Sequence, residues 1–186
     1  ALTITPDADF YGNILVSITV SDGQASDSGS FALTVNAVND APVISSIVDQ
    51  FINEDESLTL ELSASDVDLD ALTFSASSTD SDASITVDGT SLTVTPLSDY
   101  NGTFTVDVSV TDGSVSVGTS FAVTVSPVND APVLSDLLDD AIDEDGVYTL
   151  DLSASDVDGD DLTYFAQVDG NGSASVDGSA LTITPD

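Results

Sequence analysis

An internal repeat of about 90 residues restricts the fold of this chain more than any other feature. Asn39-Asp40-Ala41-Pro42-Val43 returns at residues 129–133, and residues 59–68 return at 149–158 with a single Glu-to-Asp exchange. The first seven residues, Ala-Leu-Thr-Ile-Thr-Pro-Asp, are also the last seven, 180–186. Repetition at this length indicates one domain-sized unit used several times. We expect a stretch of a longer tandem array, with the C-terminal part of one unit at 1–40, a complete unit at 41–130 and the N-terminal part of the next at 131–186.

Within each unit, apolar residues alternate with Thr, Ser and Asp, which is typical of strands with one buried face. The strands expected after a short first one at Val43 span 57–63, 72–77, 83–87, 91–96, 103–111 and 115–126. Seven strands in about 90 residues predict an all-β chain of tandem immunoglobulin-like Greek-key β-sandwiches. By the same count, residues 1–40 hold the last three strands of a unit and 131–186 the first five. Tyr100 could form the tyrosine corner of such sandwiches, but its counterpart is Phe10, which favours a packed core aromatic.

The chain has no Lys, Arg or His, so its 34 acidic residues leave a formal net charge of −34. No side chain can form a salt bridge with another, and self-repulsion destabilises the compact state unless cations from solution gather around it. We expect no nucleic-acid partner because no basic side chain can neutralise a phosphate. A serine nucleophile would lack its usual base, so we expect no enzyme, although a glycosidase-type carboxylate pair looks the same in sequence as a metal cluster. No apolar run is long enough for a membrane helix, so we expect no membrane insertion in this segment.

The acidic residues form short alternating clusters in predicted turns, such as residues 66–70 and 156–161. Calcium takes six to eight oxygen ligands in flexible geometry, which Asp and Asn in loops supply. Transition metals would find neither imidazole nor thiolate here. A single Asp is more often a solvated turn residue, but the repetition of whole clusters favours calcium. An EF-hand does not fit because its invariant Gly would fall at Asp161, and the Gly-Gly repeat of calcium-binding β-rolls is missing.

The chain resembles cadherin repeats, and in particular the bacterial cadherin-like repeats of very large surface adhesins. The resemblance is carried by Val-Asn-Asp-Ala-Pro at 38–42 and 128–132, by the acidic starts 53–55 and 143–145, by Ala-Ser-Asp-Val-Asp at 64–68 and 154–158, and by Val-Thr-Asp-Gly at 110–113. In cadherins, Ca²⁺ binds between successive repeats. The linkers here end in Ala-Pro where animal cadherins have another Asp-Asn pair, and the Asp-Arg-Glu motif has no match, so one to three ions per junction are expected.

The resemblance implies two sets of calcium ligands. At the first linker these are Asn39 and Asp40, with Asp66, Asp68 and Asp112 from the following unit and Asp9 as a further candidate from the preceding one. At the second linker they are Glu54 and Asp55 from upstream, with Asp99 as a further candidate, then Asn129, Asp130, Asp156 and Asp158. The counterpart of Asp112 there would lie beyond residue 186.

The resemblance also implies an extracellular location at the bacterial cell surface. We expect a calcium-stiffened stalk or extender segment of a large adhesin or fibre, whose partners are neighbouring repeats of the same chain. One alternative is a directly adhesive repeat that binds a glycan, another cell-surface target or like repeats. Another is a filament subunit, in which the partial sandwich at one end of a copy is completed head to tail by the other end of the next. Salt adaptation could also explain the acidity and is compatible with calcium binding.

Overall fold

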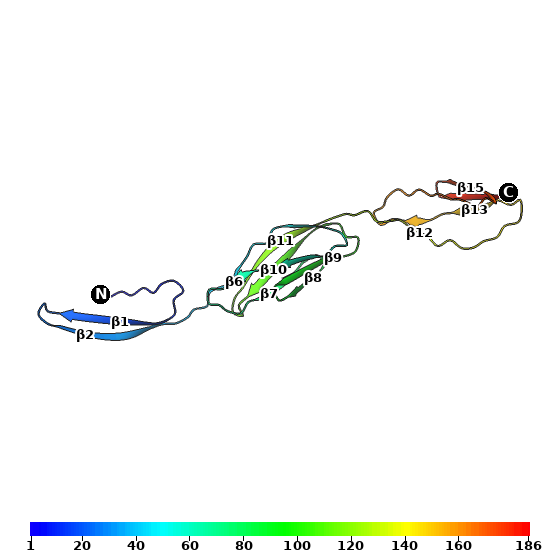
Figure 1. Ribbon diagram of the computed structural model, residues 1–186. Coiled ribbons are helices and arrows are strands. Elements are labelled where there is room, and N and C mark those ends of the chain that lie inside the picture. Colours follow the sequence, from blue (N-terminus) through cyan, green and yellow to red (C-terminus); the bar gives the residue numbers. More distant parts are fainter. The chain divides into compact units, whose positions relative to one another are not determined.

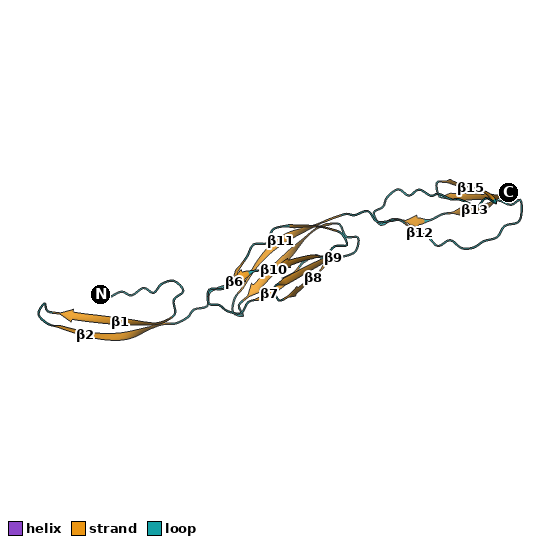
Figure 2. Cartoon of the chain, in the orientation of Figure 1, coloured by secondary structure: helices purple, strands orange, loops and turns teal.

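The computed structural model describes residues 1–186 and contains strands and no helix, which confirms the all-β prediction (Figure 2). The chain divides into two compact units, Ala1–Ser126 and Pro127–Asp186, each described here by itself. No helix in it could cross a membrane. The boundaries at 40/41 and 130/131 stay predictions from the repeat.

The complete repeat of the first unit is a two-layered β-sandwich (Figure 1). One sheet has the order β4 (Gln50–Asn53), β11 (Ser116–Ser126), β10 (Gly102–Thr111), β7 (Thr73–Ser77), and the other has the order β5 (Leu58–Glu61), β9 (Ser91–Pro96), β8 (Ala83–Asp88). A small third sheet pairs β3 (Val43–Ile44) with β6 (Ala64–Ser65). All neighbours are antiparallel except β4, which runs parallel to β11. The predicted immunoglobulin-like architecture is therefore present.

Strict alternation of side chains builds the core of this sandwich. On β10, Phe104, Val106 and Val108 are buried whereas Thr105 and Asp107 between them are exposed. Leu92 and Val94 of β9 face them from the second sheet and belong to the same apolar cluster. Successive residues of a strand point to opposite faces of a sheet, so the period of two in the sequence places one full row of side chains in the core.

Tyr100 packs against this cluster, with its ring centroid 5.9 Å from that of Phe104, which confirms the core-aromatic interpretation. Burial of the ring, followed by the nearby carboxylates of Asp82 and Asp80, raises the pKa of the Tyr100 phenol. The phenol therefore stays neutral at physiological pH.

The strand predicted at 57–63 is divided because the chain changes sheets within it, and β4 lies outside every predicted strand. β5 ends at Glu61, and β6 then pairs with β3. The Leu62 N–H still donates to Thr90 O on the β9 side (2.8 Å), whereas Ser63 O accepts from the Ser45 N–H on the β3 side (2.8 Å). The change of hydrogen-bond partner over these two residues moves the chain from one sheet to another.

Residues 1–40 form one hairpin, β1 (Gly12–Ser21) with β2 (Ser26–Val35). Its register repeats that of β10 and β11 at an offset of 90 residues, since Gly12 lies opposite Val35 and Gly102 opposite Val125. The prediction of a third strand at residues 1–6 is wrong. The counterpart of that segment, β9, is held between β5 and β8, and residues 1–40 include no counterpart of either strand.

The second unit has two sheets. One pairs β12 (Val133–Leu134) with β14 (Ala154–Ser155), and the other has the order β13 (Tyr148–Asp151), β16 (Ala180–Pro185), β15 (Gly172–Asp177). The prediction of a strand at 162–167 is wrong. Its counterpart β7 is hydrogen-bonded to β10 alone in the complete repeat, and the second unit contains no counterpart of β10.

Candidate metal centre

An acidic loop follows β6 of the complete repeat. Asp66 Oδ1 accepts the backbone N–H groups of Asp68 (2.9 Å) and Asp70 (3.4 Å), which folds the loop around this carboxylate. Its other oxygen, Oδ2, is buried and has no hydrogen-bond partner. One carboxylate oxygen from each of Asp66, Asp68 and Asp70 lies within 4.8 Å of the others. The loop therefore gathers three acids around a buried oxygen that nothing in the chain satisfies.

The linker before the complete repeat is tied to this loop. Asp68 Oδ2 accepts the backbone N–H of Asp40 (2.8 Å), and the Asn39 side-chain amide donates to Asp112 Oδ2 (2.9 Å). Backbone N–H groups of Val115 and Ser114 also donate to Asp112, so these bonds and that from Asn39 hold the pKa of the Asp112 carboxyl below its ordinary value. The structure thus brings together the five residues predicted at this junction: Asn39, Asp40, Asp66, Asp68 and Asp112.

Asp9, the further candidate from the preceding unit, lies beside the same linker. It lines one hollow of the first unit together with Asp7, Asp40 and Asp68. Its backbone is in the left-handed region (φ 59°), as is that of its counterpart Asp99 (φ 57°). Asp tolerates this conformation better than most residues because its short side chain can hydrogen-bond locally.

The second linker repeats the same hydrogen bonds within the second unit. Asp158 Oδ2 accepts the backbone N–H of Asp130 (2.7 Å), and Asp156 Oδ1 accepts those of Asp158 (3.0 Å) and Asp160 (3.3 Å). The Asn129 amide donates to Asp130 O (2.6 Å), as the Asn39 amide does to Asp40 O (2.8 Å). The linker geometry therefore recurs wherever the linker sequence and the acidic loop of the repeat recur.

Glu54, Asp55 and Asp99 lie where β4 and β11 of the complete repeat end. The Glu54 N–H donates to Ser126 O (2.9 Å), and Glu54 is the one charged side chain that is buried, with 3% of its surface exposed. The Asp99 N–H donates to Asp55 Oδ1 at 3.4 Å. These three residues lie in the first unit, and their partnership with the ligands of the second linker stays a prediction.

Asp70 is the residue of the first cluster that the ligand prediction left out. The spacing of residues 66, 68 and 70, repeated at 156, 158 and 160, was the signal that could have included it. Between Asp68 and Asp70, Leu69 has a left-handed backbone (φ 65°), and its counterpart Gly159 has the same conformation (φ 76°). The third carboxylate reaches the cluster only because the loop turns at this residue, which alternation in the sequence does not reveal.

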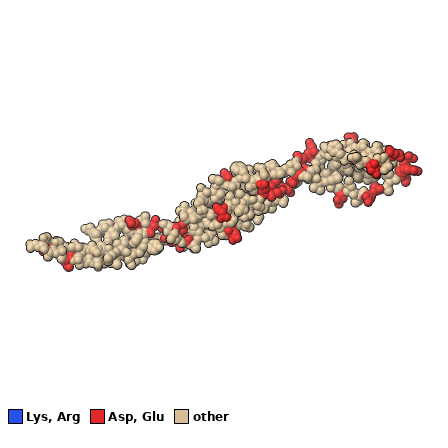
Figure 3. All heavy atoms as spheres, in the orientation of Figure 1, with Lys and Arg blue, Asp and Glu red and all other residues tan.

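Acidic side chains form separate patches on both units, and no basic side chain lies among them (Figure 3). Because every candidate ligand at the junctions is oxygen, the donor set suits a hard cation such as Ca²⁺.

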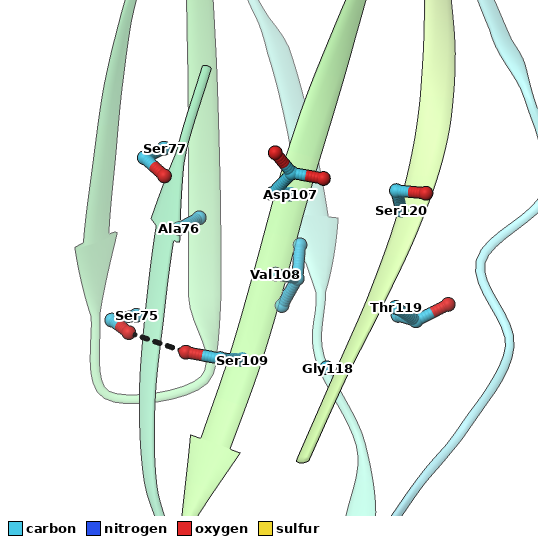
Figure 4. A pocket seen from close by; sticks show the side chains of 9 residues that line it. All are labelled: Ser75, Ala76, Ser77, Asp107, Val108, Ser109, Gly118, Thr119 and Ser120. Carbon is cyan, nitrogen blue, oxygen red and sulfur yellow. Dashed lines mark hydrogen bonds between the residues drawn. The ribbon is translucent and has the colours of Figure 1, made fainter. Parts of the chain in front are cut away.

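A shallow groove over β7, β10 and β11 offers a different surface (Figure 4). It presents hydroxyl groups and one carboxylate, that of Asp107, and Ser75 and Ser109 are hydrogen-bonded across it at 2.8 Å. Asp107 lies opposite Ser77 of β7 and Ser120 of β11 in the sheet, and the groove contains no second carboxylate with which it could form a glycosidase-type pair.

One family model matches most of the chain and agrees with the architecture. A family model described as bacterial Ig domain matches residues 39–126 and again 129–186. Curated proteins returned no match. Among solved structures, two repeats of human protocadherin-24 are 19% identical in sequence, and the match covers 79% of this chain and 78% of that one with a TM-score of 0.48. Titin domains Z1Z2 in complex with telethonin are 14% identical, and the match covers 78% of this chain and 81% of that one with a TM-score of 0.39. An endo-fucoidan hydrolase of glycoside hydrolase family 107 is 20% identical over 97% of this chain, which spans about 30% of that protein (TM-score 0.41).

Proposed function

Because the chain belongs to the bacterial Ig domain family, we propose that it is a structural segment of a larger extracellular protein of a bacterial surface, stiffened by Ca²⁺ at the linkers between its repeats. Membership in this family confirms the resemblance to bacterial cadherin-like and immunoglobulin-like repeats. Domains of this kind act as structural or adhesive modules and are typically not enzymes. The roles of Ca²⁺ and of stiffening are the proposal.

The buried Oδ2 of Asp66 is the observation that carries the proposal. A buried carboxylate oxygen without a hydrogen-bond donor is costly, and three carboxylates within 4.8 Å repel one another. A cation at this place would satisfy the oxygen and remove the repulsion together. The chain has no basic side chain that could do so. The residues present therefore fit a bound cation.

The ion at the first linker would be held by Asp66, Asp68 and Asp70. The other candidate ligands beside it are Asp9, Asn39, Asp40 and Asp112. At the second, Asp156, Asp158 and Asp160 would take the corresponding places. The Asp40 and Asp130 N–H groups already bond to a cluster carboxylate. A cation would remove the repulsion among the acids around the linker, so the carboxylates that accept these N–H groups would stay in place. A linker held by these hydrogen bonds would resist bending. Without the cation, repulsion among the acids would make the linker more flexible.

Calorimetric titration with CaCl₂ tests the proposal. Extracellular modules bind calcium at about 10⁻⁴–10⁻³ M, so the titration should cover this range at constant ionic strength. We expect Asp66→Asn/Asp156→Asn to weaken binding at least tenfold, because each change removes the central carboxylate of a cluster. Asp107→Asn/Asp177→Asn removes the same charge from strands outside the clusters and serves as the matched control.

Scattering and melting measurements separate calcium stiffening from general screening. Each occupied site should stabilise the unit that holds it by about 2.7 kcal/mol when free Ca²⁺ is at about 100 times its Kd. EDTA should reverse this gain and broaden the distribution of particle dimensions in small-angle scattering. NaCl of equal ionic strength should have the smaller effect. Equal effects of Ca²⁺ and NaCl, or scattering that EDTA leaves unchanged, would refute calcium stiffening.

A further inference from the structure

The chain contains the dipeptide Asn-Gly twice, each time where a strand begins. Gly102, which follows Asn101, is the first residue of β10, and Gly172, which follows Asn171, is the first residue of β15. Both asparagines are exposed, and the two glycines have similar backbones, with φ of 149° and 157°. Asparagine is chemically labile before glycine, because glycine has no Cβ to shield its backbone nitrogen from the preceding side chain. The two dipeptides are thus matched in sequence, exposure and backbone.

The N–H of Gly102 is engaged in the β10–β11 ladder. At the other end of these two strands, the Asp112 N–H donates to Val115 O (3.3 Å), so this pair is a hydrogen-bonded one. In an antiparallel ladder, hydrogen-bonded pairs recur at every second residue. Gly102 and Val125 lie an even number of residues farther along both strands and are therefore a hydrogen-bonded pair as well. The Gly102 N–H accordingly points to the Val125 carbonyl.

Gly172 belongs to the other kind of pair. The Asp186 N–H donates to Asn171 O (3.4 Å), so Asn171 and Asp186 form a hydrogen-bonded pair. The next pair, Gly172 with Pro185, is therefore a non-hydrogen-bonded one, and the Gly172 N–H points away from β16. β15 is the edge strand of its sheet, so no strand lies on that side to accept the N–H. The backbone nitrogen of Gly172 is free where that of Gly102 is engaged.

The complete repeat shows that this freedom comes from the position of the strand in the sheet. Ala83 takes the place of Gly172 there, since it lies opposite Pro96 at the start of β8. Across the preceding pair, Asp82 O accepts the Leu97 N–H (2.8 Å), so the Ala83 N–H also points away from its partner strand. β8 is an edge strand although every strand of that repeat is present. Completion of the sandwich by further residues therefore adds no strand at this position.

We propose that Asn171 is a site of spontaneous deamidation and that Asn101 is protected from it by the β10–β11 ladder. Hydroxide takes the amide proton of Gly172, and the nitrogen attacks Asn171 Cγ. A new N–Cγ bond forms, and the Cγ–Nδ2 bond breaks as ammonia leaves with a proton from water. Water then opens the succinimide ring at either carbonyl, which gives aspartate or isoaspartate. Water is the only co-reactant, and nothing is oxidised or reduced.

The side chain of Asn171 is held only within its own loop. Asp169 Oδ1 accepts the Asn171 side-chain amide (3.1 Å) and the Asn171 backbone N–H (3.4 Å). Neither bond engages Asn171 Cγ or the Gly172 nitrogen, so the two atoms that react stay available. Deamidation converts the amide donor into a carboxylate and places a second negative charge beside Asp169. None of the candidate calcium ligands takes part in the reaction.

Peptide mapping by mass spectrometry tests the proposal on the full 186-residue chain, aged at mildly alkaline pH in ¹⁸O-labelled water with EDTA present. Trypsin has no site because the chain lacks Lys and Arg, so pepsin is used, and its acidic buffer also stops further reaction. Each new carboxyl group carries the label. Because Gly102 reacts only when the end of the ladder opens, Asn171 should convert at least about tenfold faster than Asn101 in the folded chain.

The same chain aged in concentrated urea at the same pH is the matched control. Unfolding removes the ladder, so the two asparagines should then convert at similar rates. Asn171→Gln keeps the amide but requires a larger ring, so position 171 should no longer convert while Asn101 behaves as before. Equal rates at Asn171 and Asn101 in the folded chain would overturn the proposal. So would an Asn171 that stays an amide in the folded chain and reacts in urea.

Discussion

Leu69→Gly should stabilise the complete repeat, although it removes a large side chain. Leu69 has a left-handed backbone (φ 65°), which crowds the Cβ of any L-residue, and its side chain is 89% exposed. Little packing is therefore lost on truncation. The second unit has Gly159 at this position with a similar φ of 76°, so the loop accepts glycine in its native conformation.

The magnitude follows from two opposing terms. Holding a non-glycine residue in the left-handed region costs roughly 1–2 kcal/mol, and Gly avoids this cost. Glycine also makes the unfolded chain more flexible, which lowers the stability of the folded state by about 0.4–1 kcal/mol. The net gain should be about 0.5–1 kcal/mol. For a domain of this size, that corresponds to a rise in Tm of roughly 2–8 °C.

Thermal unfolding followed by far-ultraviolet circular dichroism measures the change, and Val67→Gly is the control. Val67 is also exposed and lies in the same loop, but its φ is not positive, so glycine there should only destabilise, by about 0.4–1 kcal/mol. The mirror change Gly159→Leu should lower the stability of the second unit. If Leu69→Gly lowers Tm as Val67→Gly does, the left-handed conformation at Leu69 carries no strain and the reasoning fails.

Three further predictions concern the complete repeat. Asn39→Ala removes one hydrogen-bond donor to the ionised Asp112 carboxyl, so it should raise the pKa of that carboxyl, which NMR titration measures. Hydrogen bonds to ionised Asp112 stabilise the fold at pH values above the unfolded-state pKa. The difference in stability between the variant and the unchanged chain should therefore disappear as the pH falls through the folded-state pKa of Asp112. Gly102→Ala should lower the unfolding free energy by about 1–3 kcal/mol in urea denaturation, since φ is +149° and a Cβ would lie 2.8 Å from the Tyr100 hydroxyl. Phe104→Ala should cost about 3–5 kcal/mol by calorimetry, because the ring is 2% exposed in the core.

Much of the fold was predictable because strand alternation and the repeat are local patterns. Thr103 to Val110 alternate without a break, and β10 has the buried and exposed faces that this alternation predicts. The division of the predicted strand 57–63 between two sheets was not predictable. It depends on which backbone groups lie opposite Leu62 and Ser63, which are Thr90 and Ser45, and no local pattern in the sequence encodes that pairing.

The candidate site was predicted in most of its members and not in its geometry. The Asp-Val-Asp spacing and the Asn-Asp linkers identified Asp40 and Asp68, which the structure joins by a hydrogen bond across 28 positions of the chain. Asp70 was left out because its approach depends on the left-handed turn at Leu69. The buried Oδ2 of Asp66, which has no hydrogen-bond partner, was also not predictable, because the burial of one atom depends on all the segments that surround it.

The sequence by itself determined the strand-rich architecture, the repeat and the lack of any internal cation, because composition and periodicity act residue by residue. Tertiary structure decided which segments become strands and which carboxylates meet. Residues 1–6 and 180–185 are identical, yet only the second copy forms a strand, since only there do β13 and β15 lie on either side of it. A strand exists only when a partner satisfies its backbone hydrogen bonds, and that partner is supplied by distant parts of the chain.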